Sequence, residues 1–292
     1  MRILLLGGTG SIGSAVLESL LARGHEVLAL GRSDEARKKL LRAGATPVAG
    51  DLAEPTHWIG AVHQVDGIIQ AAAEWGDQMN EIDQHFVTVL LDELKDSDAT
   101  KRFIYTGGCW LFGETGEDIC TEQSPYDPLA CFASVVPTVE QVLTADNICG
   151  MVIHPGMVYD SNGGVFDHIF DDVRKLGYAR IIGREDVRWP LVHRDDLATL
   201  YALMIENGRC GDVYNAAAIN GVTIGEITHT IVKRLGIGTD PVVTDVETAQ
   251  RELGSWAAGY ALDQQMSAQK AMDQLGWRPT HLDVLADVAL AD

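Results

Sequence analysis

Short apolar runs alternate with amphipathic segments over the first 150 or so residues of the chain. Alternation at this spacing is typical of βαβ units. Because the helices of such units cover both faces of a parallel sheet, its strands are continuous apolar runs. The pattern predicts an α/β fold with a doubly wound parallel sheet, the Rossmann arrangement. The expected strands are Arg2–Leu6, Glu26–Leu30, Thr46–Ala49, Gly67–Gln70, Arg102–Thr106 and Gly150–His154, and the expected helices between them are Ile12–Arg23, Asp34–Arg42 and Glu81–Leu94.

The regular alternation of strand and helix patterns ends after His154, and from there helix and loop patterns outnumber strand patterns. Helices are expected over Phe166–Leu176, Asp195–Glu206 and Thr223–Leu235. The last of them begins with Thr223 and has Glu226 three residues later, which is the capping-box pattern. We therefore expect residues 1–160 to form a dinucleotide-binding Rossmann core. Residues 161–292 are expected to form mainly a smaller C-terminal substrate-binding lobe, with segments that return to the core.

Acidic residues dominate the charge of the 292-residue chain. It contains 42 Asp and Glu against 22 Lys and Arg, which gives a formal net charge of −20. Such a surface repels polyanions and is not attracted to an anionic membrane, so we expect neither a nucleic-acid nor a membrane partner. No stretch approaches the ~18 apolar residues that a membrane-spanning helix needs. The apolar run before Gly7 is also too short for a secretory signal, which favours a cytoplasmic protein.

The cysteines point to the same compartment. There are five of them, at positions 109, 120, 131, 149 and 210, and the sequence has no Cys-x-x-Cys. An odd number argues against a disulfide framework, so all five are expected to be reduced thiols in the cytosol. Since His-x-x-x-His is missing as well, the sequence predicts no metal site.

A glycine-rich turn lies directly between the first expected strand and the first expected helix. It reads Gly7-Gly8-Thr9-Gly10-Ser11-Ile12-Gly13. In this context glycines allow a tight turn, close approach of the backbone to a pyrophosphate, and close packing of helix against sheet. The helix that follows directs its free N–H groups toward the phosphates. We therefore predict dinucleotide binding, with contacts from Gly7, Thr9, Gly10, Ser11, Ile12 and Gly13.

The end of the second strand distinguishes the two nicotinamide dinucleotides. An acidic residue there binds the ribose hydroxyls of NAD, whereas an arginine accommodates the 2′-phosphate of NADP. Here the strand continues into Gly31-Arg32-Ser33, with no acidic residue before Asp34. Arg32 and Ser33 are expected to bind the 2′-phosphate, which favours NADP. The alternative interpretation of Arg32 is a surface side chain on a turn.

Further motifs follow the turn along nearly the whole chain. They are Gly50-Asp51-Leu52, Ala71-Ala72-Ala73, His154-Pro155-Gly156-Met157-Val158-Tyr159, Trp189-Pro190-Leu191-Val192-His193-Arg194-Asp195-Asp196-Leu197-Ala198, Val213-Tyr214-Asn215-Ala216 and Leu275-Gly276-Trp277-Arg278-Pro279. In this order they resemble the extended short-chain dehydrogenase/reductase family. The resemblance implies further cofactor contacts from Asp51, Leu52, Ala71, Ala72, Thr106, Pro155, Gly156 and Val158. It also implies a homodimer formed through the helices at Glu81–Leu94 and Pro137–Ala145.

The catalytic residues of that family are where this chain departs from it. The family uses a Tyr as general acid/base, a Lys four residues later that lowers its pKa, and a Ser or Thr that orients the carbonyl. The resemblance places Phe132, Val136 and Gly108 at these positions. None of the three side chains has a proton to give. The chain thus resembles an atypical member that lacks the usual Ser/Tyr/Lys residues.

Three other side chains are candidates for the catalytic group. Thr106 and Cys109 lie at the carboxyl end of a strand, where ligands bind in open α/β sheets. Tyr126 lies in a proline-flanked loop that the resemblance places over the active site. Each has a structural alternative: Thr106 could satisfy backbone groups at the strand end, and Cys109 could be a buried hydrophobic side chain. Trp75, Trp110 and Trp189 could line an aromatic pocket or belong to the core.

Three functions remain open on the sequence alone. The first is an NADP-dependent reductase of a carbonyl, such as a ketone or quinone, on a hydrophobic and aromatic small molecule. Its proton would come from Tyr126, from water or from a phenol of the substrate. The second is a catalytically silent NADP(H)-binding sensor or regulatory protein. The third is a nucleotide-sugar epimerase or dehydratase, which needs a strong base that the chain does not offer at the usual positions.

Overall fold

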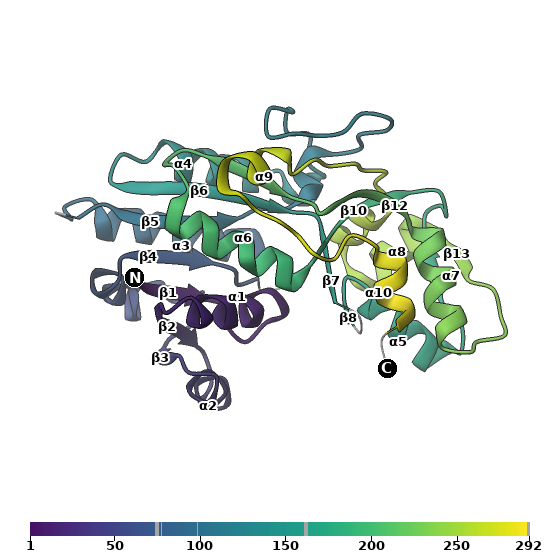
Figure 1. Cartoon of the computed structure of the whole chain (residues 1–292), viewed down its shortest axis with the longest axis horizontal. Helices are drawn as coiled ribbons and strands as arrows, with labels where there is room; N and C mark the ends of the chain where they lie inside the picture. Colours follow the sequence, from purple (N-terminus) through teal and green to yellow (C-terminus); the bar gives the residue numbers. More distant parts are fainter. Residues whose placement is uncertain (74–75, 77, 98, 161–162, 291–292) are drawn as a thin grey trace.

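The structure, a computed structural model, describes residues 1–73, 76, 78–97, 99–160 and 163–290. Its centre is a seven-stranded, wholly parallel sheet in the order β11-β6-β5-β4-β1-β2-β3 (Figure 1). The strands are β1 Arg2–Leu6, β2 Glu26–Gly31, β3 Thr46–Ala49, β4 Gly67–Gln70, β5 Lys101–Thr106, β6 Ile148–Pro155 and β11 Val213–Ala216. The order reverses direction at β1, so the predicted doubly wound α/β fold is confirmed.

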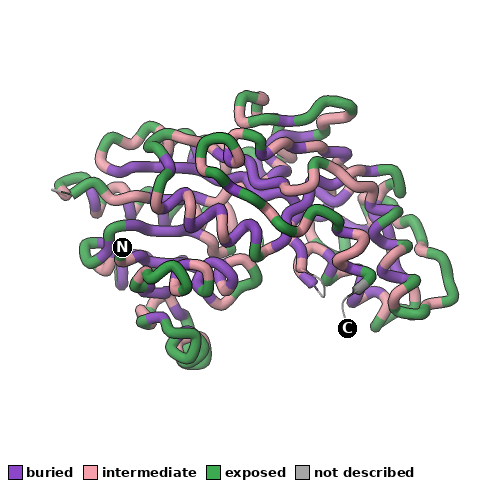
Figure 2. The backbone as a smooth tube through the Cα atoms, viewed as in Figure 1, coloured by how far each residue is buried: buried purple, intermediate pink, exposed green. Residues whose placement is uncertain are grey.

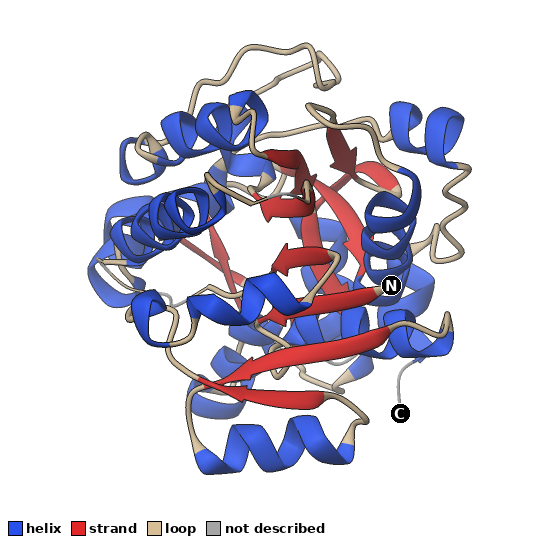
Figure 3. Cartoon of the chain, turned by 90° about the vertical axis from the view of Figure 1, so that its left-hand side faces the viewer, coloured by secondary structure: helices blue, strands red, loops and turns tan. Residues whose placement is uncertain are grey.

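Helices cover both faces of this sheet (Figure 3). The side chains of β1 explain why: Ile3 and Leu5 belong to one core cluster, and Leu4 and Leu6 to another, because successive residues of a strand point to opposite faces. The first cluster includes side chains of α1 (Ser11–Ala22) and α6 (Arg194–Asn207). The second includes side chains of α3 (Met79–Leu94) and α4 (Val135–Thr144). α2 (Asp34–Arg42) connects β2 to β3.

Most of the chain after residue 160 forms a second lobe with its own core (Figure 1). Its sheets are short: β12-β10-β7-β8 has four strands and β13-β9 has two. The strands are β7 Met157–Asp160, β8 Gly163–Gly164, β9 Arg180–Ile182, β10 Arg188–His193, β12 Ile219–Thr223 and β13 Val242–Thr244. The α-helices are α5 Asp167–Leu176, α7 Ile224–Arg234, α8 Val246–Leu253 and α10 Val284–Leu290. The lobe thus holds more strand than the sequence pattern suggested.

The 3-10 helices lie in the connections between these elements. They are η1 Pro55–His57, η2 Ile59–Gln64, η3 Cys109–Phe112, η4 Ala130–Phe132 and η5 Ser255–Ala261. The predicted cap of α7 is present, because Thr223 Oγ1 accepts the backbone N–H of Glu226. No helix within the described ranges is long and apolar enough to span a membrane.

Several segments beyond residue 160 return to the core. β11 pairs with β6, and α6 and α9 (Gln269–Leu275) pack on the sheet side opposite α3. Figure 2 shows the inner strands as the most continuously buried part of the backbone, and every residue of β6 is buried. The carboxyl edge of this buried sheet faces the second lobe.

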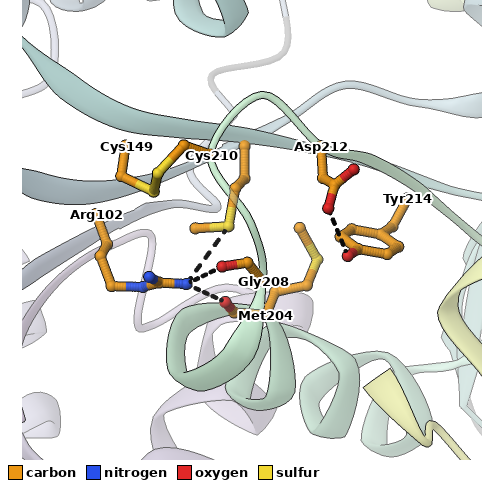
Figure 4. The surroundings of a disulfide bond; sticks show 8 residues. Arg102, Cys149, Met204, Gly208, Cys210, Asp212 and Tyr214 are labelled. Atoms are coloured by element: carbon orange, nitrogen blue, oxygen red, sulfur yellow. Dashed lines mark hydrogen bonds between the residues drawn. A yellow bond between two sulfur atoms is a disulfide. The ribbon is translucent and has the colours of Figure 1, made fainter. Parts of the chain in front are cut away.

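One expectation about the cysteines is wrong. Cys149 and Cys210 form a disulfide that joins β6 to the loop before β11 (Figure 4). The two residues are 61 positions apart, and they meet because β11 pairs with β6 next to them, Val213 opposite Val152. A count of cysteines carries no information about this pairing. Cys109, Cys120 and Cys131 are free thiols.

Candidate active site

A cavity of about 630 Å³ lies at the carboxyl ends of β1, β4, β5 and β6. One side of it is formed by the sheet and the first turn of α3, and the opposite side by residues of the second lobe. The sheet side includes Ser11, Ile12, Ala71, Ala72, Ala73, Asn80, Asp83, Tyr105, Thr106, Gly108, Pro155, Gly156 and Val158, and the lobe side includes Val165, Asp167, Trp256 and Tyr260. The cavity is thus continuous from the glycine turn to the second lobe.

The glycine turn has the shape that a pyrophosphate requires. Gly7 has a φ of +85°, and a Cβ there would lie 2.5 Å from the Ala71 carbonyl oxygen. A Cβ at Gly13 would lie 2.1 Å from the Gly7 oxygen, so helix and turn pack too closely for any side chain. Gly10 is different, because its only near neighbour would be the Gly7 oxygen at 3.4 Å. α1 begins immediately after Gly10 with no side-chain cap, which leaves its first N–H groups for a ligand.

The predicted cofactor residues divide into two groups. Nine of them line the cavity: Ser11, Ile12, Leu52, Ala71, Ala72, Thr106, Pro155, Gly156 and Val158. The others lie along the same sheet edge without lining it: Gly7, Thr9, Gly10, Gly13, Arg32, Ser33 and Asp51. In the second group the exposed Arg32 guanidinium lies 3.9 Å from the Asp51 carboxylate. Ser33 caps α2 by accepting the Ala36 N–H at 3.1 Å.

Thr106 and Cys109 line the cavity, but their polar groups are engaged. The Thr106 hydroxyl donates to the carbonyl oxygen of Gln70 and lies 2.6 Å from the Tyr201 hydroxyl, which therefore donates to it. Thr106 thus satisfies groups at the strand end. The Cys109 thiol is buried 3.8 Å from the Met157 sulfur, and burial raises its pKa to about 12. A thiol in this environment stays protonated and is a weak donor.

Tyr126 is not among the described residues that line the cavity. Its hydroxyl lies 2.9 Å from Nε2 of His154, and its ring packs against Phe112 of η3. The buried His154 also accepts the Gly108 N–H at Nδ1, and burial lowers its pKa to about 3. Because a backbone N–H can only donate, the neutral imidazole carries its proton on Nε2 and donates it to Tyr126. The structure therefore joins Tyr126 to His154 behind the cavity wall.

A cluster of aromatic rings lines part of the cavity. The Trp110 ring lies 5.6 Å from Phe132, 6.4 Å from Trp256 and 5.6 Å from Tyr260. Trp189 is instead part of the buried core of the second lobe, where its indole N–H donates to the Tyr260 carbonyl oxygen. Trp75, the third tryptophan of the predicted pocket, lies outside the described residues.

A carboxylate that the sequence analysis missed faces the same cavity. Asp83 of α3 accepts hydrogen bonds from the Tyr105 hydroxyl and from Nε2 of Gln70. Burial raises the pKa of Asp83 above its ordinary value, and the two hydrogen bonds oppose this effect. The sequence contains a signal for it, because Asp83 lies three and four residues before the buried Phe86 and Val87, on the inward face of the helix.

Comparison with known proteins identifies the family. The sequence model of the NAD dependent epimerase/dehydratase family matches residues 3–217. The chain belongs to this family. The uncharacterized protein C2A9.02 of Schizosaccharomyces pombe is 30% identical over 99% of this chain and 98% of its own length. The family resemblance in the sequence is thereby confirmed.

Solved structures share the fold. Human epimerase family protein SDR39U1 with NADPH has a TM-score of 0.79 at 21% identity, covering 99% of this chain and 98% of its own. The dTDP-glucose 4,6-dehydratase DesIV from Streptomyces venezuelae, with NAD and TYD bound, has a TM-score of 0.83 at 21% identity, covering 99% and 95%. The architecture of this epimerase/dehydratase family member is therefore that of dinucleotide-binding proteins.

The three positions that the resemblance assigns to catalysis form an apolar part of the wall. Gly108 and Phe132 line the cavity, and Val135 rather than Val136 does so among the described residues of α4. A Cβ at Gly108 would meet no atom of the described residues within 4 Å. Neither the Gly108 nor the Phe132 side chain, as they line this cavity, has a proton to donate.

Proposed function

We propose that this epimerase/dehydratase family member is an NADPH-dependent reductase of a carbonyl on a neutral, aromatic small molecule such as a ketone or quinone. One observation carries the proposal. A single cavity is lined by Ser11 and Ile12 of the glycine turn, by Gly108 and by a cluster of aromatic rings that includes Phe132. A reductase needs chiefly a cofactor and a carbonyl held next to each other.

The cofactor half of the cavity suits a dinucleotide. The open N-terminus of α1 would bind the pyrophosphate, and Ala71, Ala72 and Pro155 would lie along the nicotinamide half. When bound, the reduced nicotinamide supplies a hydride. Arg32 and Ser33 would hold the 2′-phosphate at the end of β2. The presence of NADPH in the SDR39U1 structure supports the choice of NADP.

The substrate half favours an uncharged aromatic compound. Trp110, Phe132, Trp256 and Tyr260 offer flat apolar surfaces. None of the described residues that line the cavity is Lys, Arg or His. A nucleotide sugar would bury its diphosphate there without a counter-charge, which is unfavourable. This argues against the nucleotide-sugar chemistry of relatives such as DesIV.

A catalytically silent NADP(H) sensor is the second candidate. Thr106 and Cys109 have their polar groups engaged, and Tyr126 lies behind the wall. A protein with these features could bind the dinucleotide without turning over a substrate. Only a turnover assay separates the two functions.

The test measures NADPH binding by fluorescence and NADPH oxidation with phenanthrenequinone, acetophenone and ortho-hydroxyacetophenone. Turnover of any of these supports the reductase. Tight binding without turnover supports the sensor, and tight binding of UDP-glucose would favour nucleotide-sugar chemistry.

The matched control is Gly10→Asp. The backbone of Gly10 has φ −79° and ψ 177°, which any residue adopts, and a Cβ there meets only the Gly7 oxygen. An Asp at this N-cap position should cap α1 and keep the protein folded. Its carboxylate would occupy the pyrophosphate site, so NADPH binding should be lost.

A further inference from the structure

The carboxyl group of Asp83 is part of the cavity wall. It lies in the second turn of α3 and lines the cavity together with Tyr105, Gly108 and Phe132. Gly108 and Phe132 are the positions to which the resemblance assigns the family's Ser and Tyr, so a carboxyl group that lines the same cavity is of interest. Its side chain is half-buried, so it is enclosed by protein and still reaches the cavity.

Two donors fix the orientation of this carboxyl group. Nε2 of Gln70 donates to Oδ1 at 2.6 Å, and the hydroxyl of Tyr105 donates to Oδ2. The Gln70 amide cannot be turned around, because its Oε1 accepts the Ala72 N–H at 3.0 Å. Gln70 is at the end of β4 and Tyr105 is in β5, so the two central strands of the sheet hold Asp83 in place.

Tyr105 cannot itself be the donor that the missing Tyr would have been. Its ring is almost completely buried, at 1% exposure, and its proton is directed to Asp83. The adjacent carboxylate and burial together raise the pKa of Tyr105 well above its ordinary value. The phenol therefore acts as a fixed hydrogen-bond donor to Asp83.

The surroundings of Asp83 favour its neutral form. Burial raises its pKa, while the hydrogen bonds from Tyr105 and Gln70 lower it by a smaller amount, and no cation among the described residues contributes. A carboxyl group in this setting keeps its proton to a higher pH than an exposed aspartate, as a general acid must. A neighbouring cation would instead have lowered the pKa of Asp83.

We propose that Asp83 is the proton donor of the carbonyl reduction, in place of the family's Tyr/Lys pair. This inference rests on the proposed function. In the reaction the carbonyl carbon takes the hydride of the reduced nicotinamide and the carbonyl oxygen takes the proton of Asp83. The nicotinamide leaves oxidised, the carbonyl becomes an alcohol, and the Asp83 carboxylate regains a proton from water.

Other cavity groups fit this role less well. Tyr260 is buried in the second lobe, and burial raises its pKa to about 12. Asp167 also has a raised pKa, but it is exposed and lies at the first turn of α5, on the lobe side. Asp83, by contrast, is held by Gln70 at the end of β4 and by Tyr105 of β5. Asp167 therefore provides a matched control carboxyl in the same cavity.

The first experiment compares Asp83→Asn with Asp167→Asn in steady-state reduction of phenanthrenequinone across pH. Asparagine has the shape of aspartate but no acidic proton. Its Oδ1 can accept from Nε2 of Gln70, and its Nδ2 can donate to the Tyr105 oxygen. We expect Asp83→Asn to lower kcat by ~100-fold or more, the scale of general-acid catalysis, and to remove the decline of kcat at high pH. Asp167→Asn should keep that decline at the same pH, whatever its effect on KM.

A second variant separates catalysis from a purely structural role. Tyr105→Phe removes a hydrogen bond that favours the ionised carboxylate, so the pKa of Asp83 rises. The decline of kcat should then move to higher pH, a shift that loss of packing alone would not produce. Infrared titration of the protein without cofactor gives an independent reading. A carboxylic-acid C=O band should be absent from Asp83→Asn and should titrate at higher pH in Tyr105→Phe.

The failures are distinguishable. If the wild type turns over and Asp83→Asn is equally active, or is slower with an unchanged pH profile, Asp83 is not the donor and the proposed function stands. An Asp83 band that disappears in the ordinary range of aspartate, near pKa ~3.9, also overturns the assignment. If the wild type reduces no carbonyl of the panel, the proposed function fails and this inference fails with it.

Discussion

The phenol of Tyr126 and the imidazole of His154 form a hydrogen-bonded pair behind the cavity wall, with 2.9 Å between the hydroxyl oxygen and Nε2. The other ring nitrogen of His154, Nδ1, accepts the N–H of Gly108. The pair therefore supports the backbone at the position where the family carries its catalytic serine. This relationship leads to the first two predictions.

Replacing Tyr126 by Phe should reduce stability and leave catalysis intact. The change removes the acceptor of a buried imidazole N–H, which costs about 1–3 kcal/mol in the free energy of unfolding. Urea unfolding measures this cost, and NADPH oxidation measures activity. A loss of ~100-fold in kcat would instead identify Tyr126 as the proton donor.

Stability should fall in mild acid because of His154. Burial lowers its pKa to about 3, whereas an unfolded chain has its histidines near ~6.5. Below about pH 6.5 the unfolded state binds a proton that the folded state does not, so stability falls as the pH drops toward 3, by at most about 1.4 kcal/mol per pH unit. Urea unfolding across this range should show a shallower slope for His154→Gln. An equal slope in both proteins would contradict the prediction.

If the protein uses NADP, its preference for NADPH over NADH should depend on Arg32. A charge-assisted hydrogen bond to the 2′-phosphate should make NADPH bind more tightly than NADH by about 1–3 kcal/mol. Arg32→Ala should remove most of that difference and leave the NADH dissociation constant unchanged. Arg42→Ala, at the far end of α2, is the control. Equal affinities for the two cofactors in the wild type would overturn the NADP assignment.

The Cys149–Cys210 disulfide should contribute to stability. A bridge across 61 residues restricts the unfolded chain and is worth up to ~4 kcal/mol on the entropic model. Replacing both cysteines by Ala should lower the melting temperature, and adding a reductant to the wild type should lower it in the same way. Cys131→Ala, which removes a free thiol, is the control. If reductant left the melting temperature of the wild type unchanged and the double variant melted at that same temperature, the disulfide would not contribute to stability.

The homodimer implied by the family stays a prediction. The apolar residues Phe86, Leu90 and Leu94 of α3 face the sheet, while Glu81, Gln84 and His85 are exposed on the outer side. Ile82, Val89 and Leu91 are partly exposed, so a dimer through α3 and α4 would bury a mixed polar and apolar surface. Light scattering should give twice the 31.6-kDa chain mass, and a particle of one chain mass at micromolar concentration would count against it.

The fold was predictable because the inner strands of its sheet are buried on both faces. Continuous apolar runs such as Ile3–Leu6 mark a parallel sheet directly, and the glycines of the first turn mark its nucleotide edge. The second lobe gave weaker signals, since its strands have two to six residues and lie among loops. Short elements of this kind depend on their neighbours more than on their own sequence.

The polar groups of the site were harder to predict. Thr106 and Tyr126 have the right chemistry, but only the packing shows that Gln70 and His154 engage their hydroxyls. Asp83 was missed because its importance depends on Tyr105 and Gln70, which lie on two other elements. Contacts between distant parts of the chain decide which side chains remain available for chemistry, and a single sequence does not contain them.

The C-terminal segment crosses from one part of the molecule to the other. Trp277 is buried in the core under the sheet, the Asp196 carboxylate of α6 accepts the N–H groups of Thr280 and His281, and Val284 is buried in the second lobe. This strap spans the two parts that enclose the cavity and resists their separation. A ligand would therefore enter a preformed site, so that little of its binding free energy would be spent on closing the protein around it.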